Sequence, residues 1–268
     1  MILDDYATRY PHARLERHEG VLLVTLHTDG GSLRWNSPVH GELPGLFEDI
    51  SSDRGNRVVI LTGAGQDFIR EIEPMELPEE ERDTTQRAQK YTRYPVHAER
   101  WDRTYWEGKH LLRNLLDIEV PVIAAVNGPA HIHAELALLS DIVLASTTAS
   151  FRDAPHLPHG VVPGDGSQLI WPLLLGPNRG RYFLLTSQTL CADEALKLGL
   201  VSEVHGPGEL LTRARELADE LKKLPLLTLR YTRVVLTQQI KRMVFEDVGY
   251  GLALEGLAAA AGRGREKL

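Results

Sequence analysis

The sequence predicts an α/β core over residues 1–205 and a helical region over residues 206–268. Arg57–Thr62 and Val120–Val126 are continuous apolar runs, each followed by a glycine-containing turn. Such runs are typical of strands that are covered on both faces, as in a parallel sheet flanked by helices. The C-terminal third instead has a helical pattern. The order along the chain is therefore mixed α/β first and helices afterwards.

Each further element follows from its own local pattern. Val21–Leu26 is a β-rich run that begins after Gly20 and is broken by Asp29-Gly30-Gly31. Within residues 40–50, apolar side chains recur at helical spacing (Leu43, Leu46, Phe47 and Ile50). The same reasoning predicts a strand at Ile142–Ala145 and helices at Trp106–Leu116, His133–Ser140, Gly166–Leu175, Arg179–Leu185, Ala192–Leu198, Glu209–Lys223 and Leu226–Ala261.

Residues 70–107 change character. An acidic run, 79–83, is followed by a stretch rich in Tyr, Trp and Arg with little periodicity. One interpretation is a solvated surface insertion. The other is a lid whose aromatic side chains line a pocket; these are Tyr91, Tyr94, Trp101, Tyr105 and Trp106.

Composition excludes several classes of function. The net charge of −7 argues against nucleic-acid binding. No apolar run approaches the roughly 20 residues that cross a bilayer, and Met1–Asp5 does not resemble a signal peptide. The single cysteine, Cys191, rules out an intramolecular disulfide and a cysteine-based zinc cluster. We therefore expect a cytoplasmic protein with neither nucleic-acid nor membrane partners.

Several blocks, in the same order, resemble the crotonase (enoyl-CoA hydratase/isomerase) superfamily. They are Arg57–Phe68, Val120–Ala130, Ser140–Ala145, Gly160–Gly166, Leu184–Thr186 and Ala192–Val201. The resemblance implies the crotonase-like fold, a spiral superhelix of ββα units. It also implies that the helical C-terminal region serves trimerisation.

The turns that bind thioesters in that superfamily are replaced in this chain. Members that act on acyl-CoA hold the thioester oxygen with backbone N–H groups in two glycine-containing turns, where glycine permits close approach. Here the first turn reads Phe68-Ile69-Arg70-Glu71-Ile72, and the second reads His131-Ile132-His133-Ala134-Glu135. The usual oxyanion hole is therefore not expected.

A narrower resemblance is to the β-diketone hydrolases, which include 6-oxocamphor hydrolase. It rests on Ser32–Trp35, Ile118–Pro129, Val162–Gly166, Asn178–Thr186 and Gly251–Glu255. These crotonase-fold enzymes cleave the carbon–carbon bond between two ketones in a retro-Claisen reaction. The resemblance implies a small-molecule diketone substrate, no cofactor and a homotrimer or dimer of trimers.

Within this resemblance, His156 and Asp165 are the candidates for activating water. A neutral imidazole has a pKa near the working pH and can act as the base. It needs an acceptor that fixes its tautomer, and Asp165 follows nine residues later. The resemblance assigns the chemistry to this pair, whereas the residues alone favour a surface histidine and a turn aspartate.

Three further side chains complete the expected site. His133 falls where the triple glycine would be, before a short helix whose N-terminus would lower the pKa of an imidazole. It is expected to stabilise the oxyanion or enolate, in preference to His131. Glu255 lies in an otherwise apolar helix; the resemblance has it contact His133 and move a proton to the enolate. Trp35 either donates its indole N–H to a substrate carbonyl or is ordinary core.

Other interpretations remain. An acyl-CoA hydratase or isomerase would need backbone donors at Ile69 and near Ala134. A non-catalytic crotonase-fold scaffold or RNA-binding homologue is the alternative outside enzymes. The histidine spacing matches no zinc pattern, so no metal is expected. Asp153 and His159 are interpreted as structural or supporting residues.

Overall fold

A six-stranded sheet forms the centre of the molecule. The computed structural model describes residues 1–73, 75–76, 91–92 and 98–261. The strands of the sheet lie in the order β1 (Ala13–His18), β2 (Val21–Leu26), β4 (Val58–Gly63), β8 (Val122–Val126), β9 (Ile142–Ser146) and β12 (Glu203–His205). β1 pairs antiparallel with β2, and the remaining neighbours are parallel. The parallel core predicted from the apolar runs is confirmed.

Helices cover both faces of this sheet. The α-helices in the described part of the chain are α1 (Ser37–Ser52), α2 (Ala98–Asp117), α3 (Glu135–Leu138), α4 (Ser167–Leu175), α5 (Pro177–Thr186), α6 (Ala192–Lys197), α7 (Leu210–Leu221) and α8 (Leu226–Ala261). α7 packs on one face, against Val58, Ile60 and Ile123. The larger core on the other face includes Val59, Leu61 and residues of α1 and α2. Alternate residues of one strand point to opposite faces, so Val58–Leu61 of β4 are all apolar because both faces are buried.

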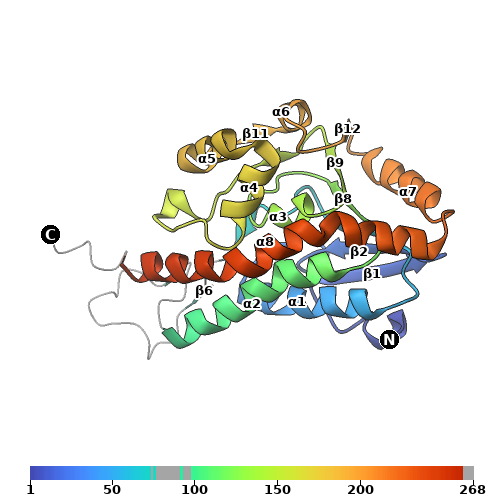
Figure 1. Ribbon diagram of the computed structural model, residues 1–268, viewed down its shortest axis with the longest axis horizontal. Helices are drawn as coiled ribbons and strands as arrows, with labels where there is room; N and C mark the ends of the chain where they lie inside the picture. Colours follow the sequence, from blue (N-terminus) through green and yellow to red (C-terminus); the bar gives the residue numbers. More distant parts are fainter. Residues whose placement is uncertain (74, 77–90, 93–97, 262–268) are drawn as a thin grey trace.

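The C-terminal helix α8 crosses the molecule beside α2 (Figure 1). It begins and ends where the sequence predicts, and its residues 252 and 255 are buried while many others are exposed. No helix in the described ranges combines the length and apolar character that a membrane span requires.

Short elements connect the sheet to the pocket described below. They are β3 (Arg34–Trp35), β5 (Glu71–Ile72), β10 (Ser150–Phe151) and the 3-10 helix η4 (Leu157–His159); the others are η1 (Leu3–Asp5), β6 (Met75–Glu76), β7 (Tyr91–Thr92) and β11 (Leu190–Cys191). Isolated bridges join Ile69 to Ala130 and Ala130 to Phe151. The segments that follow β4, β8 and β9 are thereby tied together beyond the carboxyl ends of the parallel strands, where ligands bind in open α/β sheets.

The segment 70–107 falls partly outside the described residues, including Tyr94 and the side chain of Tyr91. Its final part differs from the expectation, because α2 begins at Ala98 rather than near Trp106. Trp106 is 56% exposed and stacks on His110, so it belongs to the surface of α2. The indole N–H of Trp101 donates to the carbonyl oxygen of Leu252 at 3.0 Å, which ties α2 to α8.

Candidate active site

One pocket brings together all five residues that the sequence nominated. His156, Asp165 and Glu255 lie on one side of it, and Trp35 and His133 also line it. The remaining lining residues are Asn36, Ser37, His40, Ile72, Glu73, Thr104, Ile132, Pro155 and Leu252. The pocket is thus assembled from segments spread over residues 35 to 255, and their proximity depends on the tertiary fold.

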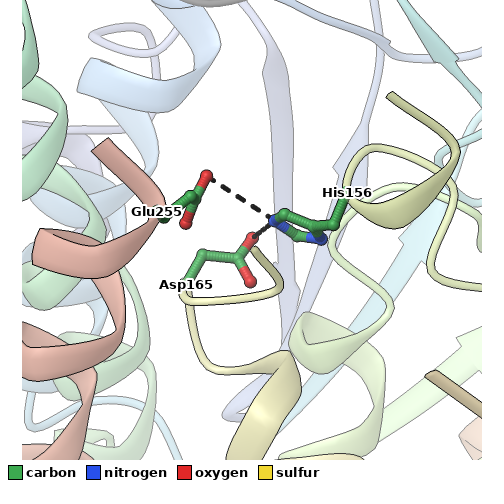
Figure 2. A group of neighbouring side chains, drawn as sticks. All are labelled: His156, Asp165 and Glu255. Carbon is green, nitrogen blue, oxygen red and sulfur yellow. Dashed lines mark ion pairs between the residues drawn. The ribbon is translucent and has the colours of Figure 1, made fainter. Parts of the chain in front are cut away.

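Asp165 and Glu255 meet because two glycines let a turn approach a helix. A Cβ on Gly164 would overlap the carbonyl oxygen of Gly251, and a Cβ on Gly251 would overlap that of Gly164. The side-chain amide of Gln168 donates to the Gly164 oxygen at 3.1 Å and holds the turn. Glycine has no side chain to prevent this close backbone contact, so the turn places Asp165 beside Glu255 of α8 (Figure 2).

His156 stands among three carboxyl groups. Its Nδ1 lies 2.5 Å from Asp153 Oδ1, and its Nε2 lies 3.4 Å from Asp165 Oδ2 and 3.6 Å from Glu255 Oε1. Figure 2 shows both of the latter carboxyl groups pointing toward the imidazole. The sequence interpretation paired Asp165 with His156 as its orienting group and placed Glu255 against His133. In the structure Asp153 holds Nδ1, and Glu255 contacts His156 instead.

Burial and charge give this cluster unusual proton affinities. Burial opposes a charge on His156, but Asp165, Asp153 and Glu255 outweigh it and raise the pKa of His156 well above its ordinary value. Burial raises the pKa of Glu255 to about 7. Burial would also raise the pKa of Asp165, yet the charge of His156 outweighs burial and lowers that pKa below its usual range. At neutral pH the cluster therefore holds a proton that His156 and Glu255 can exchange.

His133 also lies beside the carboxylate of Asp165. Its Nδ1 lies 3.4 Å from Asp165 Oδ2, and its ring centroid lies 4.1 Å from that of Trp35. Burial lowers the pKa of His133 to about 4, so the ring is uncharged at neutral pH. From the sequence, we expected the N-terminus of a helix to lower the pKa of His133. The helix that follows, α3, has four residues, and burial is the largest cause of the lowered pKa. His131 instead hydrogen-bonds Ser150 Oγ at 2.8 Å.

Sequence analysis missed a third histidine in the pocket, His40 of α1. Its Nδ1 lies 2.8 Å from Glu107 Oε2 of α2, and the other oxygen of that carboxylate, Oε1, accepts a hydrogen bond from Arg103 Nε at 2.7 Å. The His40 ring is edge-on to Trp35, with centroids 5.8 Å apart. His40 and Glu107 are 67 positions apart in the sequence, so no spacing within one element pairs them.

A buried glutamate behind the site was also missed. Glu135 Oε1 accepts hydrogen bonds from Ser167 Oγ at 2.6 Å and from the indole N–H of Trp171 at 3.1 Å. Burial raises the pKa of Glu135 to about 7. Since the amide of Ser167 lies 3.4 Å from Asp165 Oδ1, Glu135 supports the turn that carries Asp165.

Comparison with known proteins identifies the family. The Enoyl-CoA hydratase/isomerase family model matches residues 16–248 of this chain. The chain belongs to this family, the crotonase superfamily. Its sheet and helices match the solved crotonase-fold enzymes, such as an enoyl-CoA hydratase/isomerase from Mycobacterium paratuberculosis with a TM-score of 0.77, 25% identity, and coverage of 93% of this chain and 94% of that one.

Two relatives indicate different activities within the crotonase superfamily. A β-diketone hydrolase from the cyanobacterium Anabaena sp. PCC 7120, bound to (S)-3-oxocyclohexyl acetic acid, is 49% identical with a TM-score of 0.87 and covers 97% of this chain and 98% of that one. The short-chain-enoyl-CoA hydratase of Clostridium acetobutylicum is 30% identical over 91% of this chain and 86% of its own length.

The backbone donors expected of a thioester-binding crotonase are partly used elsewhere. The amide of Ile69 donates to the carbonyl oxygen of Pro129 at 3.1 Å. The amide of Ile132 in turn donates to the carbonyl oxygen of Ile69 at 3.1 Å. These bonds join the two turns to each other, so the Ile69 amide does not point a free N–H into the pocket.

The pocket also groups ligand atoms that a cation could use. His156, Asp165 and Glu255 each offer one ligand atom, and these atoms lie within 4.8 Å of one another. One imidazole and two carboxylates suit a divalent cation as well as proton transfer. The same three side chains are therefore compatible with either chemistry.

Proposed function

We propose that this crotonase-family member hydrolyses β-diketones by cleaving the carbon–carbon bond between the two carbonyl groups, without a cofactor. The observation that carries the proposal is the buried His156–Asp165–Glu255 cluster, which faces His133 and Trp35 across one pocket. The similarity to the Anabaena β-diketone hydrolase supports it. The hydrogen bond from the Ile69 amide to Pro129 argues against thioester chemistry at the usual place.

In the proposed reaction, His156 takes the proton from water as its oxygen attacks one carbonyl carbon. The imidazole must be neutral for this step, although its neighbours favour the charged form. Glu255, whose pKa is about 7 and whose Oε1 lies 3.6 Å from Nε2, can accept that proton beforehand. Asp165 remains ionised and compensates the positive charge that His156 then acquires.

The second half of the reaction breaks the carbon–carbon bond. The tetrahedral alkoxide collapses to a carboxylic acid, and the other ketone leaves as an enolate. His133 and Trp35 flank the space where oxygen charge develops, which is where donors lower the barrier. The protonated Glu255 then returns a proton to the enolate carbon, so that water has been added across the cleaved bond.

The second candidate is hydration or isomerisation of an acyl-CoA. It is favoured by the relatives at about 30% identity, among them the Clostridium acetobutylicum hydratase and the Escherichia coli carnitinyl-CoA dehydratase, which is 32% identical over 77% of this chain and 73% of its own length. This reading requires another donor for the thioester oxygen, because the Ile69 amide is already bonded.

A direct assay separates these two activities. Purified protein is mixed with a 2,2-disubstituted cyclic 1,3-dione, without CoA or metal, and the loss of diketone absorbance is followed; crotonyl-CoA is assayed in parallel. We expect conversion of the diketone to a keto acid while crotonyl-CoA stays unchanged. Turnover of crotonyl-CoA with intact diketone would refute the proposal and support the hydratase.

We also propose a cytoplasmic homotrimer or dimer of trimers that binds small-molecule substrates rather than nucleic acid or membranes. The supporting feature is the row of exposed apolar side chains on α8, which includes Leu227, Tyr231, Val235 and Leu236. Light scattering coupled to size-exclusion chromatography should give three or six times the 29.9 kDa chain mass. A monomer at micromolar concentration would contradict the assembly.

A further inference from the structure

The pocket has a second histidine–carboxylate pair, on a different wall from His156. His40 lines the pocket with its side chain 13% exposed, and Glu107 holds its Nδ1 at 2.8 Å. Burial would raise the pKa of Glu107, but the hydrogen bonds from His40 and Arg103 outweigh it and lower that pKa. Glu107 is therefore an ionised acceptor, and the His40 nitrogen that faces it must carry a hydrogen.

Two helix-interior glycines accommodate this pair. A Cβ on Gly41 of α1 would lie 2.8 Å from Glu107 Oε1 and 3.3 Å from Arg103 Nη2. A Cβ on Gly108 of α2 would lie 3.2 Å from Leu252 Cδ1 and 3.9 Å from His40 Nε2. Each glycine costs its helix about 1 kcal/mol relative to alanine. Gly41 leaves room for the Glu107 carboxylate, whereas Gly108 leaves room for the side chain of Leu252, which lines the same pocket.

The proposed chemistry needs such a donor. The Ile69 amide is bonded to Pro129, and the uncharged His133 has one N–H while its Nδ1 faces the Asp165 carboxylate. An oxyanion is stabilised best by donors that carry or can acquire positive charge in a water-poor site. His40 can supply one in its doubly protonated form, in which Glu107 holds the Nδ1 hydrogen and Nε2 carries the second.

We propose that Glu107 is a positioning residue for His40: its carboxylate accepts the Nδ1 hydrogen and offsets the charge of a ring that is protonated on both nitrogens, so that the Nε2 hydrogen is available to the substrate oxygen that becomes negative. Gly41 makes this possible by leaving the Glu107 carboxylate its place between the helices. The inference rests on the proposed diketone hydrolysis for its catalytic consequence. The orientation of the His40 ring can be tested independently of turnover.

The first variant to make is Glu107→Gln, which keeps the side-chain size and removes the charge. Glu42→Gln is its matched control, because Glu42 on the same helix as His40 holds the ring of His12 at 2.7 Å outside the pocket. The second variant is Gly41→Ala, which displaces the Glu107 carboxylate while favouring the helix. Its control is Gly45→Ala, where the nearest atom to the added Cβ is Tyr10 Oη at 3.4 Å.

Two readouts are needed for each variant. In ¹H–¹⁵N spectra of the imidazoles, the His40 Nδ1–H signal, assigned by its loss in His40→Gln, should be protected from exchange in the unmodified protein. We expect Glu107→Gln and Gly41→Ala to shift or abolish it, with the controls unchanged. On the diketone, both variants should lose roughly 10–100-fold in kcat, as for other partners that orient a functional histidine, with KM little changed.

The outcomes separate this inference from the proposed function. An Nδ1–H signal that is unaffected by both variants, or a kcat that is unchanged by both, overturns the role of Glu107. If the unmodified protein cleaves no diketone but its His40 signal depends on Glu107, the proposed function fails and the positioning of the ring stands. If Gly41→Ala does not fold, the Glu107→Gln result decides by itself.

Discussion

Replacing Gly251 with alanine should separate Glu255 from Asp165 without removing any ionisable group. The added Cβ would overlap the Gly164 carbonyl oxygen, whereas ordinary contacts begin at 3.4 Å. To relieve the overlap, α8 and the turn must move apart by about 1 Å, and a shift of that size costs on the order of 10²-fold in rate. The overpacking costs about 1–3 kcal/mol of unfolding free energy, of which about 1 kcal/mol is offset by the better helix propensity of alanine.

Activity should therefore fall far more than stability. The assay measures kcat on a cyclic β-diketone together with the urea midpoint of unfolding. Gly249→Ala is the control, because its added Cβ would meet side-chain atoms of Tyr105 and Lys109 at 3.0 and 3.4 Å, which can move aside. If Gly251→Ala retains full kcat while Gly249→Ala behaves like the unmodified protein, the close contact with Gly164 does not hold the site together.

The remaining predictions concern protons and metals. His156→Ala should lose roughly 10²–10⁴-fold in kcat, the usual contribution of a general base, whereas His131→Ala should keep its activity; undiminished hydrolysis by the former would remove His156 from the mechanism. The pKa of Glu135 is raised to about 7 in the folded state, so its stabilising contribution is present below its unfolded pKa and is lost as pH rises through 7. Relative to Glu135→Gln, the unmodified protein should lose up to about 1.4 kcal/mol per pH unit between pH 5 and 7 in urea titrations; a difference that does not vary with pH would contradict the buried carboxyl. Because side chains carry every proposed proton transfer, dialysis against a chelator should leave kcat unchanged, and a loss restored by a divalent cation would show that the His156 cluster binds metal.

The sequence predicted the central strands and the long C-terminal helix well, because the patterns that identify them are local. A continuous apolar run such as Val58–Leu61 fits a strand buried on both faces, and the predicted bounds of α8 coincide with those observed. Short edge elements such as β1 and β12 were not predicted. β1 does alternate between buried and exposed residues over Ala13–Glu16, but the alternation is short and was overlooked; β12 is half-buried throughout its three residues and has no periodicity to detect.

The sequence predicted which residues form the site better than it predicted which of them contact one another. The resemblance nominated His133, His156, Asp165 and Glu255, and the fold brings them together. Which carboxylate holds which nitrogen depends on distances of 2.5 to 3.6 Å that no spacing rule specifies. A signal for the missed pair did exist, since His40 and Glu107 each precede a glycine inside an otherwise helical segment. Such glycines often mark close packing.

The position of Glu255 near the end of α8 has a consequence for how the protein is made. Trp35, His133 and Asp165 leave the ribosome many residues before Glu255 does, and the strands of the sheet are complete by His205. A nascent chain can therefore form its sheet before it has a catalytic cluster, which is finished when the last helix docks through Gly251 against Gly164. Recovery of activity after dilution from urea should accordingly follow the docking of α8 rather than the earlier formation of the sheet.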